Sequence, residues 1–251
     1  MKTAVIALLA ALAAAVDANV IVDDSICVWK LIPLGCQPSA LCSYQYQLGD
    51  LTLSQSCRVK DGVNYYPQQI HLAYAGETTG TAMTVSWATF EAVSDSAVWV
   101  GTSESTLAKV DTTVSSTSYY SDDDYDLLHH HATVSGLSPN TVYYYKVGSE
   151  AQSTYQSDVG TFKTARSSDD TSTFNLIIYG DAGDGDNSED LIDYLNTLGT
   201  NDVDMIYHIG DISYADDDYL TASQVTGFFY EEVYNKWMNS LMPIMSFVPY
   251  M

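Results

Sequence analysis

The sequence predicts a β-sandwich domain followed by the first part of an α/β domain. Short apolar strands separated by Gly, Ser, Thr and Asp occupy residues 63–166, and strands and helices alternate over residues 172–251. A polar linker, Arg166 to Thr173, separates the two patterns. Short strands at close spacing indicate a β-sandwich, whereas strand–helix–strand alternation is typical of a parallel sheet with crossover helices.

Residues 1–18 are predicted to be a signal peptide. Lys2 provides a positive charge near the N-terminus, and an Ala/Leu/Ile/Val run extends from Val5 to Val16. Val16-Asp17-Ala18 then offers small residues at the positions that a signal peptidase recognises. Such a run is too short to span a hydrocarbon layer of roughly 30 Å. A buried N-terminal helix is the alternative, but no polar face interrupts the run. We therefore expect a secreted protein, either extracellular or vacuolar/lysosomal.

A cysteine-rich segment, residues 19–62, follows the signal peptide. It contains all four cysteines of the chain, Cys27, Cys36, Cys42 and Cys57. An even number in an exported segment predicts one or two disulfides, with three ways to pair all four. A zinc site is the alternative, but there is no Cys-x-x-Cys pair and no nearby histidine at ligand spacing.

The formal net charge of −23 restricts the partners of the protein. Such a surface repels nucleic acid and anionic membranes, so neither is an expected partner. It also repels phosphate esters unless a local positive centre overcomes the repulsion. No later run is long and apolar enough for a transmembrane helix.

The strands of the sandwich are expected at Gln69–Tyr74, Ala82–Trp87 and Ser96–Val100, with more after residue 140. Pro139-Asn140 predicts a turn. The run Leu-x-Pro-x-Thr-x-Tyr-x-Tyr that surrounds this turn resembles a fibronectin type III domain near its tyrosine corner.

The α/β part is expected to hold three strands and two helices. The strands are a buried one at Phe174–Tyr179, a second at Val203–Ile209 and a third beginning at Ile244–Val248. The first helix is expected to be capped by Ser188 and to end at Gly199, and the second to run from about Ala222 to Leu241.

The first two of these strands each end in Gly-Asp, at Asp181 and, thirty residues later, at Asp211. The carboxyl ends of parallel strands meet at one edge of a sheet, where ligands bind. Two carboxylates brought together there repel each other unless a cation lies between them. A single Gly-Asp is more often a turn. The pair, with Tyr214 three residues after Asp211, instead predicts a site for hard metal ions.

Gly-Asp-x-Gly followed by Gly-Asp-Ile-Ser-Tyr-Ala-Asp is similar to the metallophosphoesterase superfamily, and Tyr214 selects its purple acid phosphatase branch. The resemblance covers about residues 63–251, and the sandwich is similar to the N-terminal domain of the large plant-type members. It implies hydrolysis of phosphate monoesters by a water that two metal ions activate. The ions would be Fe(III) and a divalent Fe, Zn or Mn. Asp181 and Tyr214 would ligate the ferric ion, and Asp211 would bridge both.

The chain departs from the family at its C-terminal end. Val248-Pro-Tyr-Met251 is similar to the segment that leads into the family's Gly-Asn-His-Glu motif. The asparagine and histidine ligands, and the histidines that assist the leaving group, belong to motifs expected after Met251. We therefore expect this polypeptide to be an incomplete, inactive copy of an acid phosphatase. The alternative is a non-catalytic secreted binding protein or pseudoenzyme built on the sandwich. The sequence leaves a homodimer open.

Other candidate ligands are expected to be structural. Neighbouring residues of His129-His130-His131 point to opposite faces of a strand, and His208 is expected to be a satisfied buried histidine. The Asp122–Asp124 and Asp216–Asp218 runs are expected in solvated loops. Asp184 and Asp186 resemble part of a calcium loop, but position twelve is Ile192 instead of glutamate.

Overall fold

The computed structural model describes residues 29–32, 35–38, 44–48, 51–55, 65–121, 126–183, 186–199, 202–215 and 229–251. The chain divides into two compact units, one of Met1–Asn64 with Tyr214–Lys236 and one of Tyr65–Ser213 with Trp237–Met251. The expected signal peptide and cysteine pairing lie outside the described side chains. No helix in the described part is long and apolar enough to cross a membrane.

The described strands of the first unit form two antiparallel pairs. β1 (Trp29–Ile32) pairs with β2 (Gly35–Pro38), and β3 (Tyr44–Leu48) pairs with β4 (Leu51–Gln55).

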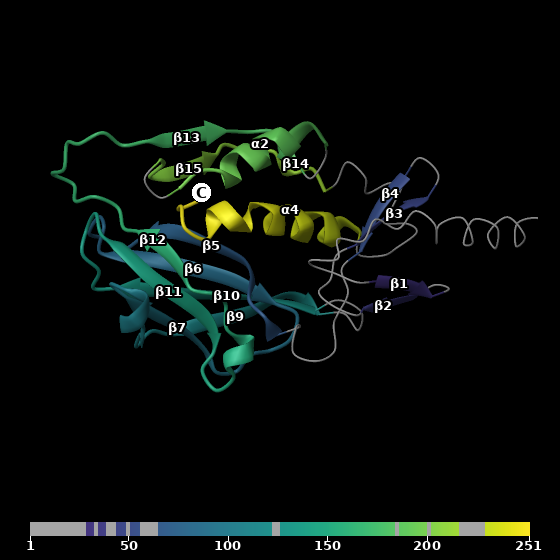
Figure 1. Cartoon of the computed structure of the whole chain (residues 1–251), viewed down its shortest axis with the longest axis horizontal. Helices are drawn as coiled ribbons and strands as arrows, with labels where there is room; N and C mark the ends of the chain where they lie inside the picture. The colour runs from purple at the N-terminus through teal and green to yellow at the C-terminus, as the bar shows by residue number, and fades with distance from the viewer. Residues whose placement is uncertain are drawn as a thin grey trace, which may run out of the picture. The chain divides into compact units, whose positions relative to one another are not determined.

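The second unit contains the expected β-sandwich, which consists of two four-stranded sheets (Figure 1). One sheet has the order β5-β6-β10-β9 and the other β12-β11-β7-β8. The strands are β5 (Gln68–Ala75), β6 (Ala82–Thr89), β7 (Ser96–Gly101), β8 (Ala108–Lys109), β9 (Val114–Ser121), β10 (Asp126–Ser135), β11 (Val142–Ser149) and β12 (Gly160–Lys163). Two 3-10 turns, η2 (Glu104–Thr106) and η3 (Ser153–Tyr155), interrupt the loops.

Inward-facing residues of both sheets form one apolar core. Alternate residues of a strand point to one face, so the core residues recur at every second position. The fully buried members include Leu72, Met83, Val85, Trp87, Val98, Tyr145, Val147 and Phe162. The strand positions predicted from the sequence are confirmed, because the apolar alternation that predicted them is the core itself.

The turn before β11 has the tyrosine-corner geometry that the sequence pattern indicated. The amide of Ser138 donates a hydrogen bond to the hydroxyl of Tyr143 at 2.9 Å. Asn140 adopts a left-handed φ of 50°, a conformation that asparagine tolerates better than most residues. The turn at Pro139-Asn140 is therefore confirmed.

The three consecutive histidines of β10 alternate between the two faces of the sheet. His130 is fully buried, lies parallel to the Trp87 ring at 5.2 Å, and bonds Thr89 Oγ1 and Ser116 Oγ through its two ring nitrogens. Burial, assisted by the charges of His129 and His131, lowers the pKa of His130 to about 4. His131 lies on the other face and bonds Ser86. The triplet thus has the structural role expected of it.

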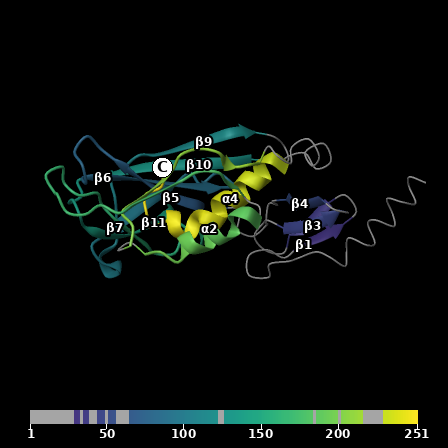
Figure 2. The ribbon, with the colours of Figure 1, turned by 90° about the horizontal axis from the view of Figure 1, so that it is seen from above.

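The α/β part contains β13 (Leu176–Tyr179), β14 (Ala182–Gly183), α2 (Asp186–Asn196), β15 (Met205–His208), β16 (Ile212–Ser213) and α4 (Phe229–Met245). β13 pairs in parallel with β15, and β14 with β16. Figure 1 shows these strands with α2 and α4, and Figure 2 shows the two helices side by side.

Two sequence expectations for this part are wrong. The third strand does not begin at Ile244, because α4 continues to Met245 and a turn follows; the backbone joins β15 only at Pro249 to Met251. Ser188 does not cap α2 from outside. It lies inside the helix, where its hydroxyl accepts a hydrogen bond from the amide of Gly183 at 2.9 Å.

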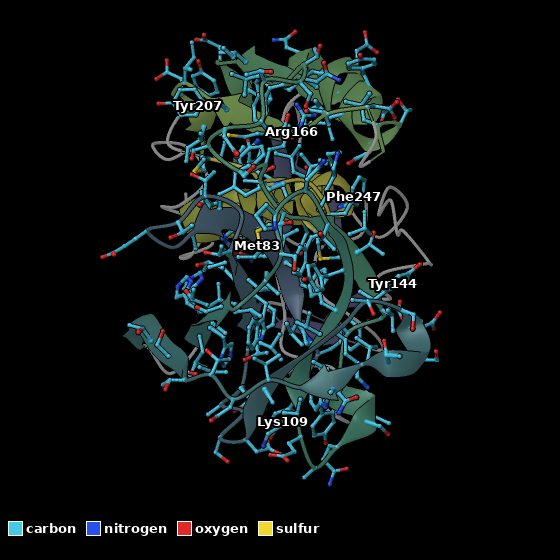
Figure 3. All side chains as sticks on the ribbon, turned by 90° about the vertical axis from the view of Figure 1, so that its left-hand side faces the viewer. Met83, Lys109, Tyr144, Arg166, Tyr207 and Phe247 are labelled. Carbon is cyan, nitrogen blue, oxygen red and sulfur yellow. The ribbon has the colours of Figure 1, made fainter. Side chains whose placement is uncertain are left out.

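One face of the β13–β15 pair is exposed. Four large apolar residues on this face have exposed fractions of 43–63%, namely Leu176, Ile178, Tyr207 and Ile209. Figure 3 shows Tyr207 on the outer side of this part. The expectation of a buried first strand is therefore wrong: Leu176 and Ile178 are exposed on a face that no described residues cover, and Ile177 and Tyr179 on the other face are half-buried. Parallel sheets are normally covered on both faces.

The last residues of the chain join the parallel strands to the sandwich. Tyr250 donates its amide to the carbonyl of Leu72 on β5, while Met251 and Ile206 of β15 also bond through the backbone. The hydroxyl of the buried Tyr145 donates to the carbonyl of Ser246, and Met242 of α4 packs on the sandwich core. The sandwich and the α/β strands consequently share one compact unit.

Asp204 is the polar centre of this junction. Arg166 Nη2 contacts both of its carboxylate oxygens, at 3.2 and 3.1 Å, and Lys163 Nζ lies 3.7 Å away. The amide of Asn175 donates to Oδ2 at 2.8 Å, and the hydroxyl of Tyr74 donates to the Asp204 carbonyl. Burial, then the charge of Asp204, raises the pKa of Tyr74 to about 12. The carboxylate thus connects a sandwich strand, the linker (Arg166 in Figure 3) and the α/β part.

We predict that Asp204→Asn lowers the free energy of unfolding by about 3 kcal/mol, because it leaves Arg166 and Lys163 partly buried without their counter-charge. The matched control is Glu150→Gln, which removes the carboxylate of the exposed Lys109–Glu150 pair and should cost less than about 1 kcal/mol. Urea unfolding followed by tryptophan fluorescence measures both. Equal losses would show that Asp204 is not the polar centre of the fold.

His130 should make the sandwich sensitive to acid. Its pKa is about 4 in the folded state and about 6.5 when unfolded, so the stabilisation is complete above pH 6.5 and is lost as the pH falls toward 4. Between pH 7 and 4.5 we expect a loss of about 2–3 kcal/mol that His130→Gln removes. The control, His131→Gln on the opposite face, should keep it. Urea unfolding of each variant at pH 7 and 4.5 measures this loss. If His130→Gln loses as much free energy of unfolding between the two pH values as the wild type does, the prediction is wrong.

Candidate metal centre

The two Gly-Asp sequences form adjacent turns at the ends of β13 and β15. The parallel ladder continues through both turns, because the amide of Asp181 donates to Gly210 O and the amide of Ala182 donates to Asp211 O, each at 3.2 Å. Beyond the turns the ladder resumes as β14 and β16. The backbones of the two aspartates therefore run side by side, at the strand spacing of about 4.8 Å. The predicted juxtaposition of Asp181 and Asp211 is observed.

Both aspartates adopt the left-handed conformation, with φ of 56° for Asp181 and 53° for Asp211. Ser213 follows with φ of 61° and Tyr214 with 50°. Residues other than glycine, asparagine and aspartate are uncommon in the left-handed region. Several left-handed residues close together cost conformational energy, which the surrounding structure must offset. Strained backbone of this kind concentrates at functional sites.

The carboxylates of Asp181 and Asp211 are exposed. Two exposed carboxylates on adjacent backbones suit a hard cation, which relieves their repulsion and takes oxygen ligands. The described residues hold no group of three or more His, Cys, Asp or Glu side chains in a metal-binding cluster. The pair therefore fits one side of a metal site rather than a closed one.

Tyr214 is the first residue of the other stretch of chain that forms the first compact unit. Its phenol is placed relative to the aspartates by chain connectivity alone, three residues after Asp211. Its left-handed backbone continues the unusual conformation of Ser213.

His208 lies directly behind the two turns. Its imidazole is 8% exposed, and Nδ1 is 2.6 Å from the hydroxyl of Tyr250. Burial lowers the pKa of His208, while the nearby carbonyls of Asp211 and Gly210 and the charges of Asp181 and Asp211 oppose this shift. Its Nε2 is buried without a partner in hydrogen-bonding geometry in the described part of the chain. The expected satisfied histidine is thus only half satisfied, and it adjoins the site.

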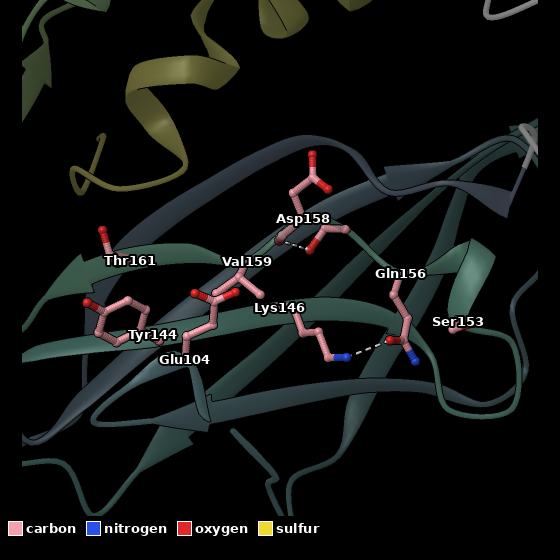
Figure 4. A pocket seen from close by; sticks show the side chains of 9 residues that line it. Glu104, Tyr144, Lys146, Ser153, Gln156, Asp158, Val159 and Thr161 are labelled. Atoms are coloured by element: carbon pink, nitrogen blue, oxygen red, sulfur yellow. Dashed lines mark hydrogen bonds between the residues drawn. The ribbon is translucent and has the colours of Figure 1, made fainter. Parts of the chain in front are cut away.

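A separate groove of about 510 Å³ lies on the outer face of β11 and β12 (Figure 4). Lys146 supplies its positive charge, but Nζ bonds Gln156 Oε1 at 2.7 Å and stands over the Trp99 ring. Two acidic side chains, Glu104 and Asp158, line the same groove. A phosphate group would meet two negative charges against one engaged cation, so this groove does not suit phosphate.

The cations with described side chains are engaged away from the aspartates. Lys109 bonds Glu150, Lys146 bonds Gln156, and both Lys163 and Arg166 bond Asp204. Among the described side chains, a phosphoryl group at the turns would therefore meet no cation that is free of another partner, and a bound metal ion would supply positive charge there.

Sequence reasoning missed the contribution of Tyr179 and Tyr250 to this region. The hydroxyls of Tyr179 and Tyr250 are 2.8 Å apart, and Tyr250 also bonds His208. The only available signal was position, because Tyr179 and His208 stand at the ends of strands that carry the Gly-Asp turns. Their contact could not be inferred without the strand register.

Comparison with known proteins identifies relatives of the chain. Residues 67–164 match the family model described as purple acid phosphatase, N-terminal domain. An acid phosphatase of Aspergillus ficuum is 35% identical over 88 residues, which cover 35% of this chain and 14% of that protein. Purple acid phosphatase 23 of Arabidopsis thaliana is 30% identical over 171 residues, 60% of this chain and 35% of that protein.

A solved structure shares the fold. Purple acid phosphatase PPD1 from yellow lupin (Lupinus luteus) seeds superposes with a TM-score of 0.62 at 23% identity, covering 83% of this chain and 39% of that chain. The chain therefore spans well under half the length of the relatives that it matches.

The turn before Asp211 should depend on glycine. Gly210 has φ of +126°, and a Cβ placed there would meet no atom within 4 Å, so the cost of Gly210→Ala is purely conformational. We expect a loss of about 1–3 kcal/mol in the free energy of unfolding. The matched control, Gly199→Ala, has no left-handed backbone, and its Cβ would meet only the side-chain Oδ2 of Asp202, at 3.3 Å, so it should cost less than Gly210→Ala. Urea unfolding compares the two variants, and equal stability would mean that the turn is not strained.

Proposed function

We propose that the chain is part of a metal-dependent acid phosphatase of the purple acid phosphatase family, which hydrolyses phosphate monoesters, because residues 67–164 match the N-terminal domain of that family. The observation that carries this proposal is the pair of adjacent Gly-Asp turns, with both aspartates left-handed and both carboxylates exposed. The family match covers the sandwich, and the turns lie in the strands that follow it.

Asp181 and Asp211 would hold the metal ions, with Asp211 shared between them and Tyr214 completing this side of the site. The ions would be Fe(III) and a divalent Fe, Zn or Mn. A bound pair of ions supplies the positive charge that attracts phosphoryl oxygens and lowers the pKa of a water molecule. The residues of this chain orient the carboxylates and keep both on one edge of the sheet.

The acidic character of the protein supports the proposal that metal ions, rather than basic side chains, attract the substrate. A chain of net charge −23 repels a phosphate monoester, and its described cations are committed to other partners. Electrostatic attraction of the substrate then depends on the metal ions and weakens with distance from them. Secretion, predicted from residues 1–18, is part of the same proposal.

The experiment that tests the function starts from the whole reading frame. The transcript is sequenced past the codon for Met251, and its complete product is loaded with Fe(III) and Zn²⁺ and assayed on p-nitrophenyl phosphate. We expect hydrolysis that Asp211→Asn lowers by about 100-fold or more in kcat/KM. Asp193→Asn, an exposed carboxylate on α2, is the matched control and should leave the rate unchanged.

The 251-residue chain alone should not hydrolyse this substrate, because Asp181, Asp211 and Tyr214 are only part of the expected ligand set. A complete product that is inactive, or whose activity is indifferent to Asp211→Asn, would overturn the proposal in favour of a non-catalytic binding protein.

A further inference from the structure

Three side chains form a hydrogen-bonded chain, which we call the Tyr-Tyr-His relay. Tyr179 and His208 end β13 and β15, and Tyr250 lies in the segment that bridges to β15. The Tyr179 and Tyr250 hydroxyls are 2.8 Å apart, and the Tyr250 hydroxyl is 2.6 Å from His208 Nδ1. Tyr179 and His208 are register partners on β13 and β15, and the Tyr250 backbone bridges to Ile206 on the other side of β15. The relay therefore crosses β13, β15 and the Tyr250 segment just before the turns.

The direction of the hydrogen bonds in the relay follows the tautomer of His208. The imidazole lies beside the carbonyls of Gly210 and Asp211, which can only accept hydrogen bonds. In the tautomer that carries its proton on Nε2, Nδ1 accepts a hydrogen bond from the Tyr250 hydroxyl. Tyr250 in turn accepts from Tyr179. In this tautomer each hydroxyl donates once, and the chain ends at His208, whose Nε2 has no hydrogen-bond partner in the described part of the chain and lies two residues before Gly210.

Aromatic packing holds the relay rigid. The Tyr179 ring lies 4.5 Å from the His208 ring, and the Tyr250 ring meets His208 nearly at a right angle, 88°. Trp237 of α4, 1% exposed, contacts both His208 and Tyr250. Burial of this kind strengthens hydrogen bonds and limits the rotamers of the three side chains.

The turns that the relay supports are the strained ones. Asp181 follows Tyr179 by two residues, and Asp211 follows His208 by three, and both aspartates are left-handed. A left-handed aspartate persists only where its surroundings determine the conformation. Ligands of metals are generally oriented by such outer hydrogen bonds, whose loss costs about 10–100-fold in metal affinity.

We propose that His208, held by Tyr250 and Tyr179, is a positioning residue that fixes the Gly210-Asp211 turn and thereby aims the Asp211 carboxylate at a hard metal ion. This inference rests on the proposed function, since it assumes that Asp181 and Asp211 bind a cation. The inference adds an explanation of how the turn at the end of β15, which carries Asp211, is oriented.

The test uses the 251-residue chain and Tb³⁺, a hard, oxygen-seeking ion whose emission nearby tyrosine and tryptophan sensitise. The Asp181→Asn/Asp211→Asn variant supplies the background from the other carboxylates. Tyr250→Phe removes only the central hydroxyl. The matched control is Tyr74→Phe, which removes the hydroxyl of another half-buried tyrosine, one that donates to the carbonyl of Asp204. We expect Tyr250→Phe to weaken the specific Tb³⁺ component about tenfold and Tyr74→Phe to leave it unchanged.

His208 is tested by two substitutions. His208→Leu should weaken the specific component as much as Tyr250→Phe does. His208→Gln, whose amide N–H can reach the position of Nε2, should restore part of it. A merely structural role would give no such rescue, because both substitutions remove the ring. Equal affinity in wild type, Tyr250→Phe and His208→Leu would overturn the inference and leave the proposed function standing.

A metal-free measurement separates failure of the inference from failure of the proposed function. Hydrogen exchange is measured at the amides of Asp181 and Ala182, which bond Gly210 O and Asp211 O. We expect exchange at these amides to be about tenfold faster in Tyr250→Phe than in Tyr74→Phe. If wild type shows no Tb³⁺ component above the double-variant background, the cation site fails and the metal-directed role fails with it. The exchange rates then still decide whether the relay fixes the turn.

Discussion

The partly buried carboxylate of Asp204 is the constraint on which the arrangement of the second unit depends. The carboxylate forms ion pairs with Arg166 and Lys163 and accepts a hydrogen bond from the amide of Asn175. The backbone carbonyl of Asp204 accepts a hydrogen bond from the hydroxyl of Tyr74. These partners belong to the sandwich, the linker and the α/β part, so one side chain sets the distance between all three. A buried carboxylate is costly unless every oxygen is satisfied, and that cost makes alternative placements of the linker unfavourable.

Much of the sandwich could be predicted because its signals are local. The alternation that includes Leu72, Val85 and Val98 is both the sequence pattern and the core, and Pro139-Asn140 with Tyr143 encodes a specific corner. The pairing of Asp181 with Asp211 could also be predicted, since parallel strands bring their carboxyl ends to one edge. The structure adds the left-handed backbone of both aspartates, which no residue type dictates.

The parts that escaped prediction depend on contacts between distant segments. α4 extends past Leu241 to Met245 because Ile244 and Met245 are fully buried there, and a short apolar run reads equally well as helix or strand. The position of Ser188 inside α2 follows from its bond to Gly183, which sequence spacing does not reveal. The Tyr-Tyr-His relay needs the register of β13, β15 and the Tyr250 segment, and Tyr179 and Tyr250 are 71 residues apart in the chain. Tyr214, placed by connectivity alone, stays a prediction.

The docking of the last residues on β5 also has a consequence for synthesis. Asn239 bonds the backbone of Gln69 across 170 residues, and Tyr250 bonds Leu72 across still more of the chain. Ribosomes add about 5–20 residues per second, so β5 is made on the order of ten seconds before the segment that completes its edge. An open strand edge in a nascent chain is a template for wrong pairing. The sandwich therefore emerges first with its β5 edge unprotected, and the second unit can close only when residues 239–251 have left the ribosome.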